Sequence, residues 1–438
     1  MEQRGTTGAH PEAAVGATTE FEPDVMELLV QTLRRADGSE LPAVGTDTLL
    51  GELVMGDTDA GAAIAPGMRK AGALSGVIRG HAGRGWARDD EVHGAPVAAD
   101  RQGDEAEVDA AWREAWWRHG LGWRGSAPES GRVPSRMTGA MRACLLLALR
   151  AARAEGTISV RCRHVARALL EVPDSRAGEA LLLQRLDPAA AATALDRLDA
   201  DAAAGTEGVE SRGVTLLRRA GTLGRSGNRL TRALTSWTSG AGQDGSPVLF
   251  AVSVEAVRQA VRCGRLAAEP VDLLLGILAL DRALYVAGRS LPASLADANA
   301  APELLRRHGV RQDALVSSAA AIPSAESPGV PGVPGVPGVP GVPGVPGVPG
   351  GDGSDGGDRD GDPSRLSAAA DRIKAVARLT AAKHGSATVG TVHLLSALLD
   401  EPVTDGDAGS GGTVVRLLAA GRVDVAALRA EPALRAAV

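Results

Sequence analysis

The residue types that most often carry out catalysis are scattered along this chain. Its 438 residues include eight histidines, three cysteines and only three lysines. The phosphate-binding pattern G-x-x-x-x-G-K-[ST] is absent, as are G-x-S-x-G and H-E-x-x-H. No Cys/His spacing matches a zinc site. We therefore predict no catalytic residue, no metal site, no nucleotide site and no cofactor.

Two histidines lie in a recurring context. His164 and His393 each stand shortly before a Leu-rich segment, and Thr391 precedes the second of them. A similar segment near the N-terminus has Thr46 and Asp47 in place of this Thr and the residue after it. A His at the start of a helix is more often structural than catalytic, and Asp47 suits the N-terminus of a helix as a favourable acid.

The elements that would position these residues are helices, seen best in 366–431. Ala and Leu recur at helical spacing through Ala368–Ala382, and Lys383-His384-Gly385 gives a basic end and a stop. Thr391 can cap a second helix, Val414–Ala420 forms a third, and Asp424 can cap a fourth. We expect a four-helix unit with no strand.

This unit resembles the repeat of the N-terminal domain of Clp ATPases. The resemblance rests on matching positions in order along the repeat, namely Val389, Gly390, Thr391, His393, Leu394, Leu395, Leu398, Val415, Leu417, Leu418, Asp424 and Leu428. In that family two repeats related by pseudo-symmetry form one helical domain. The resemblance implies an all-α fold of tandem four-helix repeats, without the ATPase modules.

The same order of helices predicts four repeats, paired one with two and three with four. The predicted units are a disordered terminus 1–20, repeat one 21–79, a polar linker with a Trp-rich helix 80–134, repeat two 135–198, a basic linker 199–246, repeat three 247–320, a spacer 321–363 and repeat four 364–438. The spacer includes seven Gly-Val-Pro units, 329–349, which favour polyproline II. A collagen trimer is the less favoured alternative.

Two segments leave alternatives open. Trp112, Trp116 and Trp117 lie on one predicted helix. They either pack on the neighbouring domain or form an exposed aromatic anchor for a partner, while a platform for single-stranded nucleic acid is disfavoured by the acidic residues before them. The Arg- and Leu-rich segment 214–237 resembles a membrane-surface helix, but its glycines favour a loosely helical connector.

Composition narrows the class of partner. The net charge of −6 gives no general attraction to nucleic acid. No apolar run reaches the length of a membrane span, and the polar N-terminus lacks the apolar region of a signal peptide. The odd, scattered cysteines indicate a reducing compartment. We expect a cytoplasmic protein.

The expected function is therefore non-catalytic binding of proteins or peptides. The resemblance implies a module that receives substrates or adaptors for a Clp unfoldase, so the partners would be a Clp ATPase, its adaptors or its clients. In some members of the family a Glu between the Thr and the His helps to hold phosphorylated arginine. That position is Asp47, Arg163 or Val392 here, and only Asp47 could accept hydrogen bonds from a guanidinium group. Thr46, Asp47, Thr391 and His393 are the candidate contact residues; the alternative is a regulatory scaffold unrelated to proteolysis.

Overall fold

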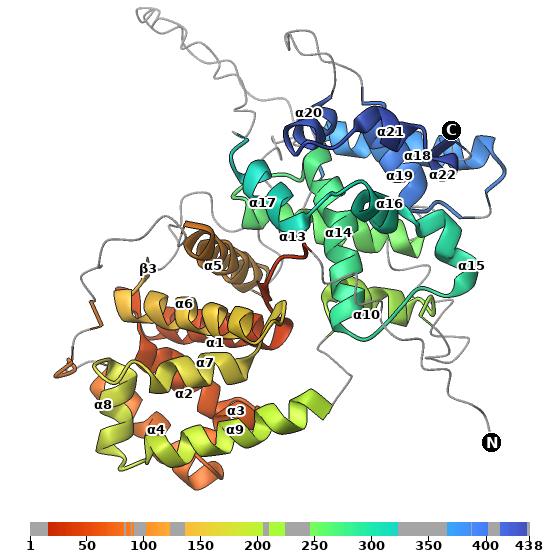
Figure 1. Cartoon of the computed structure of the whole chain (residues 1–438). Helices are drawn as coiled ribbons and strands as arrows, with labels where there is room; N and C mark the ends of the chain where they lie inside the picture. The colour runs from red at the N-terminus through yellow and green to blue at the C-terminus, as the bar shows by residue number, and fades with distance from the viewer. Residues whose placement is uncertain are drawn as a thin grey trace, which may run out of the picture.

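The computed structural model describes residues 16–82, 85–88, 90–91, 102–122, 136–204, 210–223, 246–322, 366–386, 388–401 and 412–435. Most of these residues are helical, which confirms the predicted predominance of α-helix. The helices form two groups, one built from the first half of the chain and one from the second (Figure 1). Each group encloses a hydrophobic core of its own.

The first half places its helices around an aliphatic core that extends from Phe21 to Leu195. Its helices are α1 (Pro23–Gly38), α2 (Thr46–Met55), α3 (Asp59–Ile64), α4 (Met68–His81), α5 (Gln102–Gly122), α6 (Gly139–Ala154), α7 (Cys162–Leu170), α8 (Arg176–Leu183) and α9 (Pro188–Ala204). Apolar residues at helical spacing on α1 and α6 face inward, and Leu29, Leu33, Leu145 and Leu149 are fully buried.

The second half encloses a core that extends from Val214 to Leu434. Its helices are α10 (Arg212–Arg219), α13 (Pro247–Arg262), α14 (Pro270–Val286), α15 (Ala293–Ala296), the 3-10 turn η3 (Asp297–Asn299), α16 (Ala301–Arg307), α17 (Gln312–Ala320), α18 (Ala368–Lys383), α19 (Thr391–Leu399), α20 (Thr413–Ala420), α21 (Val425–Arg429) and α22 (Pro432–Arg435). The residues predicted as repeats three and four thus share one core. Assignment of either half to Clp-type repeats stays a prediction.

Short parallel strand pairs lie where helices begin in the first half, outside the unit 366–431 for which no strand was expected. β1 (Glu20–Phe21) pairs with β4 (Ser159–Val160), and β2 (Ala43–Val44) pairs with β3 (Arg136–Met137). A single bridge between Ala268 and Leu366 has the same parallel sense in the second half. Because these pairs are two residues long or less, they leave no alternation of hydrophobic residues from which the sequence could predict them.

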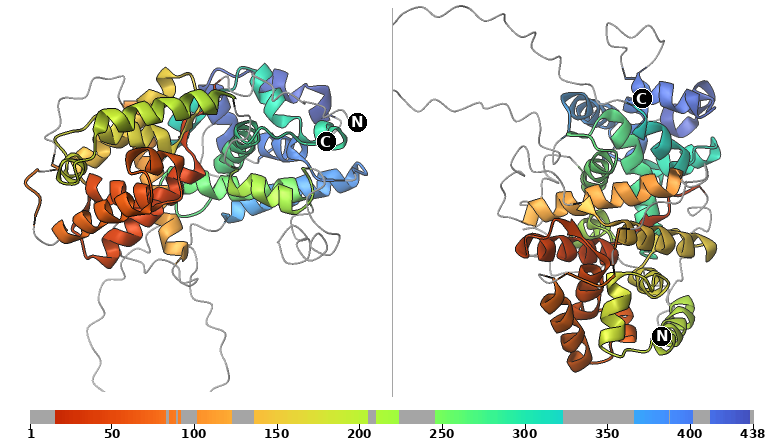
Figure 2. Two further views of the ribbon diagram at one scale, coloured as in Figure 1. Left: turned by 90° about the horizontal axis from the view of Figure 1, so that it is seen from below. Right: turned by 90° about the vertical axis from the view of Figure 1, so that its left-hand side faces the viewer.

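Helix α5 lies between the two halves. It packs on α1 and α6 of the first half and on α13 of the second, and the right-hand view of Figure 2 shows it, in orange, between the two groups. The segment 80–134 was predicted as a polar linker with a Trp-rich helix, and α5 is the helix that lies there. Asp90 in the same range is also fully buried, because its carboxylate serves helix ends as described below.

The segment 199–246, predicted as a basic and loosely helical connector, contains helix α10. Within it, α10 packs on α13, and the side chains of Val214 and Leu217 are fully buried in the second core. Ser211 caps this helix, since its hydroxyl accepts a hydrogen bond from the backbone N–H of Val214 at 3.3 Å. The arginines of α10 lie on the opposite side from its buried residues, as in an ordinary amphipathic helix.

Several predicted segments lie wholly or partly outside the described residues. The spacer 321–363 is outside them apart from its first two residues, and so is most of the N-terminal segment 1–20. The described end of that segment is ordered, because the backbone N–H of Thr18 donates to Gln312 Oε1 at 3.4 Å. Across the described ranges, every helix is too short or too polar to traverse a bilayer.

Candidate functional site

The predicted contact residues Thr46 and Asp47 lie at the buried start of α2. Asp90 caps this helix from a distant part of the chain: its Oδ2 accepts the N–H of Thr46 at 2.8 Å, and its Oδ1 accepts the N–H of Arg176 at 2.8 Å. Thr46 Oγ1 accepts the N–H of Ala177 at 3.1 Å. The side chains of Thr46 and Asp90 therefore join the first turns of α2 and α8, and they do not face solvent.

Asp47 is 3% exposed and lies close to the Asp90 carboxylate and the Arg176 guanidinium. Burial raises the pKa of Asp47 and the negative charge of Asp90 raises it further, while Arg176 opposes the rise. The Asp47 carboxylate therefore faces other side chains of this protein and not the solvent. A phosphorylated arginine could not reach its carboxylate without opening the contact between α2 and α8.

The recurring histidines also serve helix ends. His393 Nδ1 accepts the N–H of Gly390 at 3.1 Å, and His164 Nδ1 accepts the N–H of Arg161 at 2.9 Å. Each His stands at the third position of its helix and satisfies an N–H that would otherwise lack a partner at the helix start. Asp272 does the same on α14, where its Oδ2 accepts the N–H of Glu269 at 2.9 Å.

Thr391 and His393 are 3% and 5% exposed. Thr391 is the first residue of α19 rather than its cap, and its N–H donates to Asn299 Oδ1 at 3.0 Å. The structure thus places Thr46 and Asp47 in one half and Thr391 and His393 in the other, all four with buried side chains. A direct role of these four residues in binding a peptide stays a prediction, and none of them offers an exposed surface to a peptide.

The three predicted anchor residues divide between the two cores. Trp112 is 7% exposed and belongs to the first core, Trp116 packs against the same core, and Trp117 packs against the second core. The exposed aromatic anchor is wrong for Trp112, because α5 is covered on several sides. The alternative, that these indoles pack on the neighbouring domain, agrees with the packing of Trp112 and Trp116 on the first core and of Trp117 on the second.

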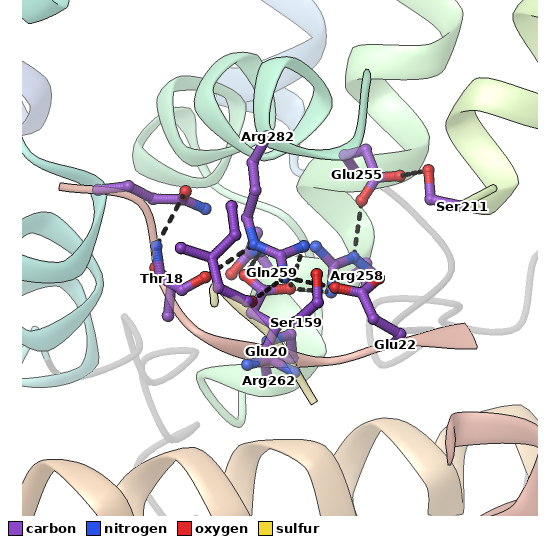
Figure 3. A network of polar contacts seen from close by, with 12 residues as sticks. Thr18, Glu20, Glu22, Ser159, Ser211, Glu255, Arg258, Gln259, Arg262 and Arg282 are labelled. Atoms are coloured by element: carbon purple, nitrogen blue, oxygen red, sulfur yellow. Dashed lines mark hydrogen bonds and ion pairs between the residues drawn. The ribbon is translucent and has the colours of Figure 1, made fainter. Parts of the chain in front are cut away.

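A buried network of charged side chains joins the two halves beside α5, and Figure 3 shows its centre. The first half contributes carboxylates from β1 and α5, and the second half contributes guanidinium groups from α13 and α14. The carboxylates are those of Glu20, Glu22, Glu107, Glu114 and Glu255, and the guanidinium groups are those of Arg118, Arg258, Arg262 and Arg282. Glu255 and Arg118 are the exceptions to this division, since each pairs with a group of its own helix.

Arg262 of α13 binds two carboxylates of α5 across the junction. Its Nη2 lies 2.7 and 2.6 Å from the two carboxylate oxygens of Glu107, and its Nη1 lies 3.0 Å from Glu114 Oε2. Arg258 Nη1 lies 2.7 Å from Glu20 Oε2. Charge-assisted pairs of this length are the stronger class of protein hydrogen bond.

Arg282 holds the N-terminal strand. Its Nη2 donates to Glu22 Oε1 and to the backbone oxygen of Ile158, each at 2.6 Å, and its Nε donates to the backbone oxygen of Thr18 at 2.7 Å. One guanidinium group of α14 therefore binds the chain on both sides of the β1–β4 pair. Such a fork of donors is specific to arginine.

The carboxylates of this network differ in proton affinity. Burial raises the pKa of Glu107 to about 7, although the nearby Arg262 opposes the rise. Burial acts on Glu114 in the same sense, but Arg118, Arg258 and Arg262 outweigh it and lower its pKa to about 2. The guanidinium groups around Glu20 likewise hold its pKa well below the usual range. Of Glu20, Glu107 and Glu114, Glu107 therefore takes up a proton first as the pH falls.

A cavity of about 260 Å³ opens beside the network, lined in part by Pro23, Trp117 and Arg212. Arg212 is exposed and makes no ion pair with any described residue. The network groups in the wall are already paired with one another. The arrangement suits adhesion of the two halves and the reception of a polar group, and the described residues contain no cluster of His, Cys, Asp or Glu suited to a metal ion.

Sequence reasoning missed this network. Its arginines alternate with apolar residues on α13, where Arg258 and Arg262 are one turn apart, and Glu107 and Glu114 are two turns apart on α5. This spacing places each pair on one face of its helix. The sequence did contain a signal for this network. Pairs of charged residues lie on one face of a helix whose apolar residues are buried.

Comparisons with known proteins return nothing: no family model, no curated protein and no solved structure matches this chain.

Proposed function

We propose that this chain is a non-catalytic protein-binding protein. The observation that carries the proposal is an open apolar face on α18, where Leu379 is 70% exposed and Val376 is 47% exposed one turn away. Large apolar side chains that stay in water next to each other are typical of a surface that binds another protein.

The charged junction supports the same proposal. Arg262 is 2% exposed and its carboxylate partners Glu107 and Glu114 are 5% and 0% exposed, so the two halves cannot shift without separating buried charges. Separating buried charges is costly. A platform fixed in this way loses little conformational freedom when it binds, and this favours affinity.

The proposed partner is a Clp ATPase, one of its adaptors or one of its clients. This part of the proposal is supported by the resemblance of 366–431 to the Clp N-terminal repeat and by the helical character of the chain. The protein would present clients to the machine or occupy its adaptor site as a decoy. A regulatory scaffold outside proteolysis is the alternative.

Calorimetry of the intact chain with the Clp ATPase hexamer of its host, and separately with the isolated adaptors, tests the choice. Binding with a dissociation constant of about 1 μM or tighter supports the adaptor or decoy role. Absence of binding to both, together with capture of other proteins by the same chain, would overturn the link to Clp and leave the scaffold.

A further inference from the structure

The cavity of about 260 Å³ at the junction has a wall that comes from both halves. The first half contributes β1, the start of α1 and helix α5, and the second half contributes α10, α13 and α14. Pockets that take drug-sized ligands measure about 300–1,000 Å³. This cavity therefore suits a smaller molecule, which would contact both halves at once.

The carboxylates in the wall of this cavity are already bound. Each accepts from a guanidinium group, and Ser211 also donates to one of them at 2.9 Å, as Figure 3 shows. The pairs are Glu20 with Arg258, Glu22 with Arg282, Glu114 with Arg118, and Glu255 with Arg258. Because each negative charge has a positive partner in direct contact, the wall has little attraction left for a cation.

Several donors in the same wall have no acceptor. Arg212 is exposed and forms no hydrogen bond or ion pair with any described residue, and the indole N–H of Trp117 has no acceptor among those residues either. Arg258 donates through its Nε and Nη1 atoms, while its Nη2 makes no hydrogen bond within the described ranges. A wall with spare donors and engaged acceptors favours a ligand that accepts hydrogen bonds and carries negative charge.

Two helices also begin at this cavity. Glu22 and Pro23 belong to the start of α1, and Ser211 and Arg212 belong to the start of α10. The first turn of a helix carries a partial positive charge, which stabilises a nearby anion. No side chain caps the start of α1. The two helix starts therefore act in the same direction as the unpaired donors.

The rest of the wall is apolar. The indole ring of Trp117 and the side chains of Pro23, Val254 and Ala283 line the cavity together with the charged groups. An anion without carbon, such as phosphate, would leave these side chains without a partner. The wall suits a ligand that joins one anionic group to a compact apolar body.

We infer that this cavity binds a small organic carboxylate, whose carboxylate accepts hydrogen bonds from Arg212 and from the indole N–H of Trp117 and whose apolar body lies against Val254 and Ala283. The planar guanidinium group of arginine matches a carboxylate in shape. This site is separate from the open face of α18, so the inference goes beyond the protein binding proposed above and does not depend on it.

The probe is phenylpropionate, which carries one carboxylate on a short aromatic body. Its binding to the intact chain is followed by ligand-observed NMR at fixed salt and neutral pH. We expect saturable binding with a dissociation constant of about 1 mM or tighter. Phenylpropanamide and phenylpropylamine keep the body and replace the carboxylate by a neutral or a positive group, and each should bind about tenfold more weakly or less.

Variants of the wall test the assigned contacts. Arg212→Gln should weaken binding of phenylpropionate by about tenfold, because it removes a charge-assisted hydrogen bond. Trp117→Phe keeps an aromatic ring and removes the N–H, and it should weaken binding by about fivefold. Arg219→Gln is the matched control, since Arg219 is exposed on the same helix and lies outside the cavity wall. It should leave the affinity unchanged.

A ligand that contacts both halves should also stabilise their arrangement. Saturating phenylpropionate should raise the urea midpoint of the intact chain, and Arg212→Gln should remove most of that rise. Three results would overturn the inference: no binding of phenylpropionate, equal binding by the Arg212→Gln variant, or binding of phenylpropylamine as tight as that of phenylpropionate.

Discussion

The interior of each half and the junction between the halves are built from different side chains. Inside each core the buried residues are almost all Ala, Leu, Val and Ile, and aromatic residues make up only 2% of the chain. At the junction the buried residues are Glu and Arg in direct pairs. The contacts within a core are non-directional, while each contact of the junction requires a particular partner.

The cores and the junction therefore have different roles: the cores stabilise each half, and the junction fixes how the two halves are placed. Apolar burial stabilises each half in proportion to the area removed from water. Buried ion pairs add little net stability, because the cost of removing the charges from water offsets their attraction, but a charge left without its partner is strongly unfavourable. The junction therefore selects one relative placement of two bodies that the cores have already stabilised.

The largest expected effect follows removal of one junction cation. Arg262→Ala leaves Glu107 and Glu114 buried beside a missing charge, and we expect a loss of about 3–5 kcal/mol. Because the cores are untouched, the loss should appear as separation of the halves. In urea, tryptophan fluorescence is weighted toward the first half, because Trp86, Trp112 and Trp116 lie at the first core and Trp117 at the second. The fluorescence transition should then no longer coincide with that of far-ultraviolet circular dichroism.

Arg311→Ala is the matched control for this variant. Arg311 is 62% exposed at its side chain and pairs with Asp313 two residues away, so its loss should leave both transitions in place. Coincident transitions in the Arg262→Ala variant, at the midpoint of the unmodified protein, would contradict the role assigned to the junction.

Shortening a buried side chain in either core tests the same comparison between the cores and the junction. Leu50 and Leu274 are fully buried in the first and the second core. Leu50→Ala and Leu274→Ala should each cost about 2–5 kcal/mol through lost burial and the cavity left behind. In contrast to the junction variant, each should lower protection from hydrogen exchange mainly in its own half. Equal losses in both halves would show that the cores are not independent.

The junction should also respond to pH. Glu107 has a folded pKa of about 7, above its ordinary value of 4.5, so the folded state binds more protons than the unfolded state between those two values. Stability contributed by Glu107 is then present below the lower value and is lost as the pH rises through about 7. A shift of this size corresponds to an upper limit of about 3 kcal/mol.

Urea titrations at pH 5 and pH 8 measure this loss, and Glu107→Gln should reduce it. Asp272, with a pKa raised by burial to about 6, contributes in the same direction, so Asp272→Asn is the comparison within the second core. A steeper loss of stability in the Glu107→Gln variant would contradict the assignment.

The sequence predicted the cores better than the junction. Apolar residues at helical spacing predicted the helix Ala368–Ala382, which is α18 (Ala368–Lys383), because that periodicity reflects burial on one face. Asp424 was expected to cap a helix and does so, with its Oδ1 accepting the N–H of Ala427 at 2.9 Å. These features depend on residues within a few positions of each other.

Features that depend on distant residues were not visible in the sequence. Asp90 caps α2 from 44 positions away, and Asn299 caps α19 from 92 positions away. Arg282, near the end of α14, reaches the N-terminal strand, and Asn299 lies in the segment that follows this helix. From the sequence alone, a charged residue such as Glu107 is expected to face solvent, because its partner across the junction is not apparent.

The smallest expected effect lies at the exposed start of α21. Asp424→Ala removes the side-chain acceptor of α21 and should cost about 1 kcal/mol. Asp424→Asn keeps an acceptor at the same position and should recover most of the loss. Unlike the junction cation, Asp424 is exposed and leaves no buried charge behind, so fluorescence and circular dichroism should still report a single midpoint, shifted slightly. A loss as large as that of Arg262→Ala would mean that local caps, rather than the charged junction, hold the two halves together.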